Sequence, residues 1–130
     1  MPREIINVPV LSQVALDNGA PLSMVTRGGG MVFVSGTPPL DIKTGEFVMG
    51  DISVQTRVSL TAMMHCLKAA GTNADNILMV RIYAANAGFY DQINAVYKTF
   101  FPDNQPARTF VPVAGWPKPF DIEIDCMALA

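Results

Sequence analysis

Charged residues are scarce in this chain, and its basic residues do not cluster. Only 15% of the 130 residues are charged, whereas 50% are hydrophobic, which is an apolar composition for a small single domain. So few charges cover the surface of a monomer poorly, and we expect a buried interface between subunits. The net charge is −2, and the nine Lys and Arg residues lie singly along the chain. Nucleic-acid binding is not expected, because no basic stripe can follow a phosphate backbone.

Cysteine and histidine are rarer still, which excludes several kinds of site. Cys66 and Cys126 form neither a disulfide scaffold nor a CxxC motif. The single histidine, His65, cannot build a zinc centre or a histidine-based triad. We therefore expect no metal and no cofactor, and a structural role for His65.

Long hydrophobic runs are also missing. No stretch approaches 18 apolar residues, so no membrane-spanning helix is predicted. The first ten residues, MPREIINVPV, lack the basic segment and the long apolar core of a signal peptide. We therefore expect a cytoplasmic protein with reduced thiols.

The hydrophobic pattern predicts one α+β domain over residues 1–130. The expected strands cover residues 23–27, 31–36, 77–85, 107–113 and 120–129, with a further short one at 46–49, and the expected helices cover 51–70 and 89–101. One sheet with both helices on a single face is the simplest packing of this order. Its uncovered face would be apolar, so we expect several copies to bury it around a common axis in a closed cyclic oligomer.

A lone arginine, Arg108, follows Pro106 in the stretch QPARTFVPVAGWPKPFDIEID, residues 105–125. Two interpretations of this arginine are open. It either holds a carboxylate of the protein or is solvated at the end of a strand, or it binds the carboxylate of a substrate through both guanidinium nitrogens. The second interpretation predicts a site for a small carboxylated metabolite.

The final strand carries three acids at alternate positions, Asp121, Glu123 and Asp125. Such a row is typical of a solvated strand face, although three like charges side by side repel one another. In a partly dry cleft the pKa of Glu123 would rise, and its carboxylate would exchange protons with water. We expect Glu123 and Arg108 to lie on neighbouring strands.

Three weaker candidates have an ordinary structural explanation as well as a functional one. Ser35 ends an apolar strand and either forms a turn or directs its hydroxyl at a ligand. Asn94 lies near the apolar face of the second helix, where an amide usually makes a local hydrogen bond. Trp116 is more typical of a packing residue than of a surface that stacks on substrate.

Five segments resemble, in the right order, the RidA/YjgF family of enamine/imine deaminases: VFVSGTPPLDIKTGE, GDISVQTRVSLTAMMHCLKAAG, FYDQINAVYKTFF, PARTFV and IEID. The resemblance implies a chorismate-mutase-like α+β fold with one mixed sheet, assembled as a barrel-like homotrimer with sites between subunits. By the same resemblance, Arg108 binds the substrate carboxylate, Glu123 positions a water, and Ser35 and Asn94 line the pocket.

Two positions depart from the pattern of the family. Leu22 stands where active members usually carry tyrosine, and Phe110 where they usually carry cysteine. Leu22 removes a hydroxyl and Phe110 adds a large apolar wall to the substrate pocket. The departures therefore predict a substrate range of the chain's own.

The leading functional hypothesis is a cofactor-independent deaminase that converts a 2-imino or enamine acid into a 2-oxo acid and ammonia. Arg108 would hold the carboxylate, and Glu123 would activate the water. The alternative is a non-catalytic trimeric sensor of a small carboxylated metabolite, which the missing tyrosine and cysteine favour. An RNA-directed nuclease is a third class, and the scattered basic residues and single histidine argue against it.

Overall fold

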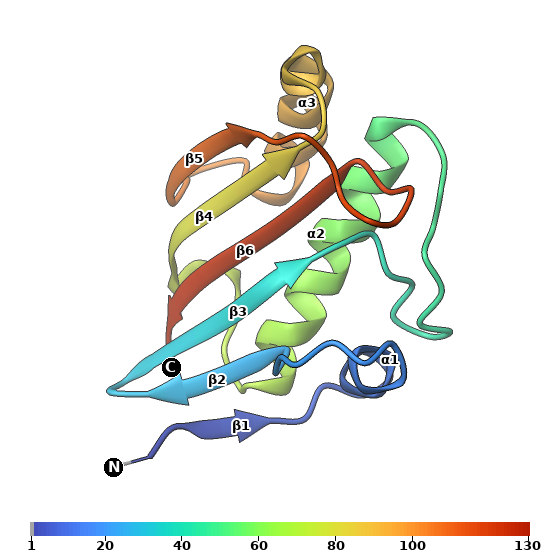
Figure 1. Ribbon diagram of the computed structural model, residues 1–130. Coiled ribbons are helices and arrows are strands. Elements are labelled where there is room, and N and C mark those ends of the chain that lie inside the picture. The colour runs from blue at the N-terminus through green and yellow to red at the C-terminus, as the bar shows by residue number, and fades with distance from the viewer. Residues whose placement is uncertain (1) are drawn as a thin grey trace.

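A six-stranded sheet organises the computed structural model, which describes residues 2–130 (Figure 1). Its strands are β1 (Glu4–Ile6), β2 (Val25–Gly28), β3 (Met31–Thr37), β4 (Ile77–Ala84), β5 (Ala107–Pro112) and β6 (Ile122–Leu129). They lie in the order β1-β2-β3-β6-β4-β5, and every neighbouring pair is antiparallel except the parallel pair β4 and β5. The predicted α+β class with one mixed sheet is confirmed.

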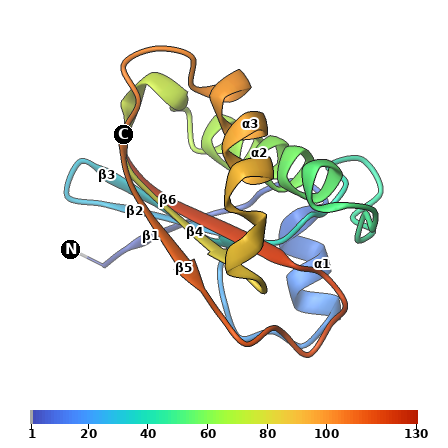
Figure 2. The ribbon, with the colours of Figure 1, turned by 90° about the horizontal axis from the view of Figure 1, so that it is seen from above.

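The two long helices, α2 (Ile52–Ala69) and α3 (Tyr90–Phe100), cover the same face of this sheet (Figure 2). Side chains of β4 and β6 that face the helices are fully buried, as Ile82 and Ile124 are. The predicted layer arrangement is therefore confirmed, and the core lies between the sheet and the two helices.

The start and the end of α2 follow from local sequence signals. The Asp51 carboxylate accepts a hydrogen bond from the backbone N–H of Val54 at 3.0 Å and caps the first turn. Gly71 takes φ 79° after the last turn, a conformation that glycine adopts at low cost. Between these ends, Leu60 and Leu67 are fully buried, in agreement with the predicted apolar stripe.

The structure adds two elements near the N-terminus and removes one expected strand. A short helix, α1 (Leu11–Asp17), and the three-residue strand β1 precede β2. Residues 46–49 form no strand, since only an isolated bridge joins Leu40 to Phe47. Both additions are too short for periodicity to reveal them, because one or two buried residues define no period.

None of the helices formed by residues 2–130 covers the other face of the sheet, which is partly apolar. Phe33 pairs with Met127 across β3 and β6, and Met31 pairs with Leu129. Phe33 and Leu129 are 44% and 46% exposed. Within residues 2–130, no helix is both long and apolar enough to cross a bilayer.

Candidate active site

Arg108 lies on the edge strand β5 and faces α3. Its guanidinium carbon is 4.8 Å from the ring centroid of Tyr97 and 5.6 Å from that of Tyr90, so two aromatic rings hold the cation. The guanidinium also donates a long hydrogen bond of 3.4 Å to the Tyr90 hydroxyl. The ion pairs found among residues 2–130 do not include Arg108. Its charge therefore meets no carboxylate within the described part of the protomer.

A cavity of about 320 Å³ lies beside Arg108, and Asn94, Tyr97, Lys98 and Gln105 contribute polar groups to its lining. The Asn94 Oδ1 atom and the Tyr97 hydroxyl are buried and have no hydrogen-bond partner within residues 2–130. Buried polar groups are normally satisfied. Burial raises the pKa of Tyr97 to about 12 against the lowering effect of Arg108, so this hydroxyl stays protonated near neutral pH. The cavity thus offers a small anion the Arg108 cation and the unused hydroxyl donor of Tyr97, whereas Asn94 Oδ1 is an unused acceptor.

Glu123 lies on β6 with its carboxylate across β3. A Cβ atom at Gly36 would collide with the Oε1 atom of Glu123, so the absence of a side chain at position 36 makes room for the carboxylate. Burial raises the pKa of Glu123 above its ordinary value, and the charge of Asp125 raises it further. The raised pKa that a partly dry cleft predicts is therefore found at Glu123.

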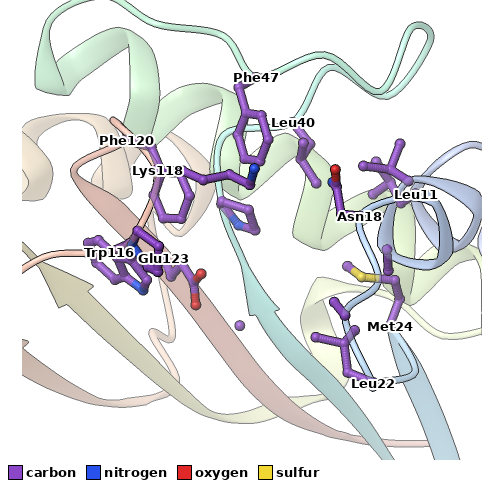
Figure 3. A pocket seen from close by; sticks show the side chains of 16 residues that line it. Leu11, Asn18, Leu22, Met24, Leu40, Phe47, Trp116, Lys118, Phe120 and Glu123 are labelled. Atoms are coloured by element: carbon purple, nitrogen blue, oxygen red, sulfur yellow. The ribbon is translucent and has the colours of Figure 1, made fainter.

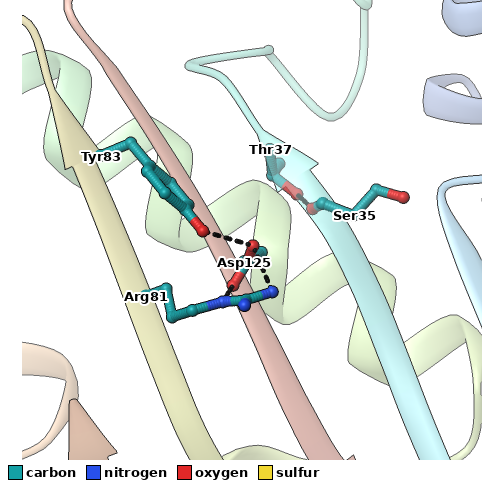
Figure 4. A network of polar contacts seen from close by, with 5 residues as sticks. All are labelled: Ser35, Thr37, Arg81, Tyr83 and Asp125. Carbon is teal, nitrogen blue, oxygen red and sulfur yellow. Dashed lines mark hydrogen bonds and ion pairs between the residues drawn. The ribbon is translucent and has the colours of Figure 1, made fainter. Parts of the chain in front are cut away.

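The two neighbouring acids, Asp121 and Asp125, form hydrogen bonds with other side chains, which corrects the expectation of a row of solvated acids. Asp121 precedes β6, and its carboxylate accepts a hydrogen bond of 3.1 Å from Gln55 of α2. Asp125 accepts two hydrogen bonds from Arg81, at 2.8 and 3.1 Å (Figure 4). Glu123 alone of the three has no such partner among the described residues. The strand is not a plain solvated face, because each acid has a different environment.

Arg108 and Glu123 do not meet within one protomer. The prediction that they lie on neighbouring strands is wrong, since β4 lies between β5 and β6. Arg108 is in register with Val80, whereas Glu123 is in register with Tyr83. Because side chains alternate between the faces of a sheet, Arg108 faces the helices and Glu123 the other side.

The remaining candidate residues lie either near Arg108 or near Glu123. Phe110 packs edge-on against Tyr90 at a centroid distance of 5.0 Å and so lies on the Arg108 side, as Asn94 does. Leu22, which is 49% exposed, lines a cavity with Glu123 (Figure 3). The Ser35 hydroxyl donates to the carbonyl oxygen of Ser23 at 2.6 Å. Ser35 thus fastens the segment that carries Leu22.

Three residues of the site, Tyr90, Tyr97 and Gly36, are not predicted as site residues from the sequence, although both tyrosines lie in the segment FYDQINAVYKTFF that resembles the family. Tyr90 and Tyr97 are seven residues apart, so they share one face of α3. That spacing is a usable signal for a pair of rings beside a cation. Gly36 gives no signal of its own, since its role depends on the approach of Glu123 from another strand.

Outside these places, His65 and the two cysteines have structural surroundings. His65 Nε2 lies 3.2 Å from the carbonyl oxygen of Pro9 and joins α2 to the N-terminal segment. Burial raises the pKa of Cys66 and of Cys126 to about 12, so both remain thiols. Among residues 2–130, no group of three or more His, Cys, Asp or Glu side chains is arranged to hold a metal ion.

Comparison with known proteins agrees with this fold. The family model described as Endoribonuclease L-PSP matches residues 12–130. A RutC family protein of Pyrococcus horikoshii is 37% identical over 108 residues, which make up 83% of this chain and 86% of the relative. A 2-iminobutanoate/2-iminopropanoate deaminase of Dermatophagoides farinae is 30% identical over 128 residues, or 98% and 97% of the two chains. The crystal structure of E. coli TdcF with bound serine matches 98% of each chain with a TM-score of 0.84 and 31% identity.

The fold, a single mixed sheet with helices on one face, is shared with solved structures of the Rid protein family. The chain belongs to the RidA/YjgF family, whose model carries the description Endoribonuclease L-PSP. Relatives named as imine deaminases support that activity at the level of the family.

Proposed function

We propose that the protein hydrolyses 2-imino acids, or their enamine tautomers, to 2-oxo acids and ammonia, in a site shared by two copies of the chain. The observation that carries this proposal is the separation of Arg108 from Glu123. The cation and the carboxylate face opposite sides of one sheet, and each meets a cavity with groups left unused. A second copy that places its Arg108 cavity over the Glu123 of the first would complete the site.

The Arg108 half is suited to the carboxylate of the substrate. A guanidinium binds a carboxylate in a planar, bidentate fashion and keeps its charge at every physiological pH. The protonated hydroxyl of Tyr97 can donate a hydrogen bond to that carboxylate, whereas the unpaired Oδ1 atom of Asn94 can only accept one. The relative TdcF was crystallised with serine, itself a small carboxylate, which supports this assignment.

The Glu123 half is suited to the reacting water. The carboxylate accepts a proton from water as its oxygen bonds to C2, and the electron pair of the C=N bond moves to nitrogen. Glu123 returns this proton to nitrogen, which gives a 2-amino-2-hydroxy acid. The hydroxyl proton on C2 then passes through Glu123 to the nitrogen, and the C–N bond breaks as the C=O bond forms, which releases ammonia and the 2-oxo acid. An imine is already electrophilic, so holding the carboxylate and the water in place provides the main assistance.

The assembly we propose is a homotrimer. The uncovered sheet face carries exposed apolar side chains such as Phe33 and Leu129, which a closed ring of three copies would bury. Light scattering at micromolar concentration is expected to give three times the 14.0 kDa of one chain. A monomeric mass would leave Arg108 and Glu123 apart and would overturn the shared site.

The direct test is ammonia release from 2-imino acids generated freshly from amino acids by an amino-acid oxidase. We expect release above the spontaneous rate, with the 2-oxo acid as the other product. A non-catalytic sensor is the second candidate, because Leu22 and Phe110 provide no hydroxyl or thiol at the substrate. If 2-oxo acids bind but no 2-imino acid is hydrolysed faster than in buffer, the sensor replaces the enzyme.

A further inference from the structure

We propose that the apolar cavity beside Glu123 binds a large hydrophobic side chain of the substrate, so that the preferred substrates are 2-imino acids with branched aliphatic or aromatic side chains. This inference rests on the proposed function and specifies the substrate class of that site. It depends on the shape, the lining and the position of one cavity.

The cavity has a volume of about 230 Å³ and lies where α1 meets the ends of β3 and β6. Its wall is apolar and includes Leu11, Val14, Met24, Leu40, Phe47 and Phe120. The rings of Phe47 and Phe120 stack at 5.4 Å with an angle of 8° between their planes, and Trp116 packs on Phe120 at 5.0 Å. Such a surface favours an apolar occupant, because burying polar groups against it leaves them without partners.

Glu123 is the acidic residue of this wall, and its carboxylate lies at one side of the space between Trp116 and Met24 (Figure 3). Glu123 also lines a second hollow on the helix-free face, together with Tyr83 and Asp125. The carboxylate therefore stands where the apolar cavity meets the open face of the sheet. If C2 of a substrate lies beside a water on Glu123, its side chain has direct access to the cavity.

The size of the cavity decides between small and large side chains. An apolar protein cavity of about 150 Å³ is large enough to hold benzene. A cavity of about 230 Å³ accommodates an isobutyl or benzyl group, whereas the methyl group of 2-iminopropanoate would leave most of it unfilled. Each methylene that a hydrophobic pocket buries changes kcat/KM by about tenfold or more.

The cavity is lined by one basic residue, Lys118, as well as by Glu123. The Lys118 Nζ atom lies 5.8 Å from the ring centroid of Phe47, so a cation–π contact holds the ammonium at the aromatic edge. The competing occupant is therefore a side chain that ends in a carboxylate. The fully buried Leu11 and the nearly buried Met24 and Leu40 argue for the apolar one, since a carboxylate among them would lose its hydration.

The test compares the imines of alanine, leucine, phenylalanine and glutamate as substrates of the wild-type protein. Ammonia release is expected with kcat/KM at least about tenfold higher for the leucine and phenylalanine imines than for the alanine imine. Calorimetric titration with pyruvate, 4-methyl-2-oxopentanoate, phenylpyruvate and 2-oxoglutarate gives the same ranking without turnover. Equal or better constants for the alanine or glutamate compounds would overturn the inference.

Filling the cavity from α1 provides the structural arm of the test. Ala15 lines the cavity, whereas the adjacent Leu16 is 71% exposed. Ala15→Phe is expected to lower the ratio of kcat/KM for the leucine imine over the alanine imine by at least about tenfold. Ala15→Leu should produce a smaller fall and serves if the larger residue unfolds the protein. Leu16→Phe places the same ring at the adjacent, solvent-exposed position, and it should leave the ratio unchanged.

The outcomes separate this inference from the proposed function. If the wild type hydrolyses imines but the ratio does not respond to Ala15→Phe or Ala15→Leu, the cavity is not the side-chain site and the deaminase proposal stands. If no imine is hydrolysed but phenylpyruvate binds more tightly than pyruvate and the Ala15 variants abolish that difference, the cavity is supported and the reaction is not. If neither hydrolysis nor 2-oxo acid binding occurs, both proposals fall.

Discussion

The Arg108 cavity and the Glu123 cavity belong to the same proposed site but differ in the charge and polarity of the groups that line them. The first contains a cation with no carboxylate partner among the described residues and two buried polar atoms without hydrogen bonds there. The second has a mainly apolar wall, with Lys118 and Asn18 among its lining residues and one carboxylate, Glu123, whose pKa burial has raised. The difference shows how the proposed site would orient a 2-imino acid. Its carboxylate is favoured in the Arg108 cavity, and its apolar side chain is favoured in the Glu123 cavity.

The largest effect is expected from Glu123→Gln, which keeps the size of the side chain but removes its ability to accept a proton. Turnover should fall on the order of 10²–10⁴-fold while binding of 2-oxo acids persists. Ammonia release and calorimetry on the same preparations measure both quantities. Equal turnover in the variant and the wild type would return Glu123 to a merely structural role.

Arg108→Ala should chiefly affect binding. Removing one partner of a desolvated charge pair costs about 2–5 kcal/mol, or roughly 30-fold to several thousand-fold in affinity for a 2-oxo acid. Arg108→Lys should recover little of the loss, because an ammonium cannot reproduce the planar fork of the guanidinium. Thermal melting of both variants controls for folding, and wild-type affinity in either one would remove Arg108 from the site.

A smaller effect should follow from Tyr97→Phe, which keeps the ring under Arg108 and removes the buried hydroxyl. A hydrogen bond to a charged group contributes about 1.5–3 kcal/mol, so 2-oxo acid binding should weaken by about tenfold or more. Tyr90→Phe is the matched control, since Tyr90 also lies beside Arg108 but is 44% exposed. If the two variants weaken binding equally, the unpaired hydroxyl of Tyr97 is not a ligand contact.

The smallest effect concerns stability and its dependence on pH. The pKa of Glu123 is raised in the folded protein, mainly by burial and then by Asp125, so its protonated form favours folding. This stabilisation is present below the unfolded pKa and is lost as pH rises through the folded pKa. Glu123→Gln should therefore melt at a higher temperature than the wild type near neutral pH, and the gap should close in acid. A variant that melts lower than the wild type at about pH 7.5 contradicts the raised pKa.

Much of the fold is predictable because its long elements carry a strong signal. The buried stripe of α2 contains Leu60 and Leu67, and its cap, Asp51, is visible in the sequence. Helix α1 is not, since it has seven residues, one of them fully buried, and its preceding residue Val10 makes no side-chain cap. Short elements that are stabilised by tertiary contacts contain too few residues for helix propensity or hydrophobic periodicity to predict them.

The chemistry of the site is more predictable than its arrangement. Residue type and family motif identify Arg108 and Glu123, and the sequence also predicts how side chains alternate between the two faces of each strand. The order of strands is not, because β6 inserts between β3 and β4 while the crossover through α3 places β5 outside β4. That order puts β4 between the two residues, and the register of β5 and β6 on β4 places them on opposite faces of the sheet. The position of Gly36 beneath Glu123 likewise depends on pairing between segments far apart in the sequence.

The shared site is tested most directly by mixing two inactive variants, Arg108→Ala and Glu123→Gln. After co-unfolding and refolding equal amounts of the two, interfaces that join an intact Arg108 of one chain to an intact Glu123 of the other should form at random. At each interface, the chain that supplies Arg108 carries an intact arginine with a probability of about one half, and the chain that supplies Glu123 carries an intact glutamate with the same probability. About a quarter of the wild-type ammonia release is therefore expected to return. If the mixture stays as inactive as its components while wild type refolded in the same way regains its activity, both residues act within a single chain and the account is wrong.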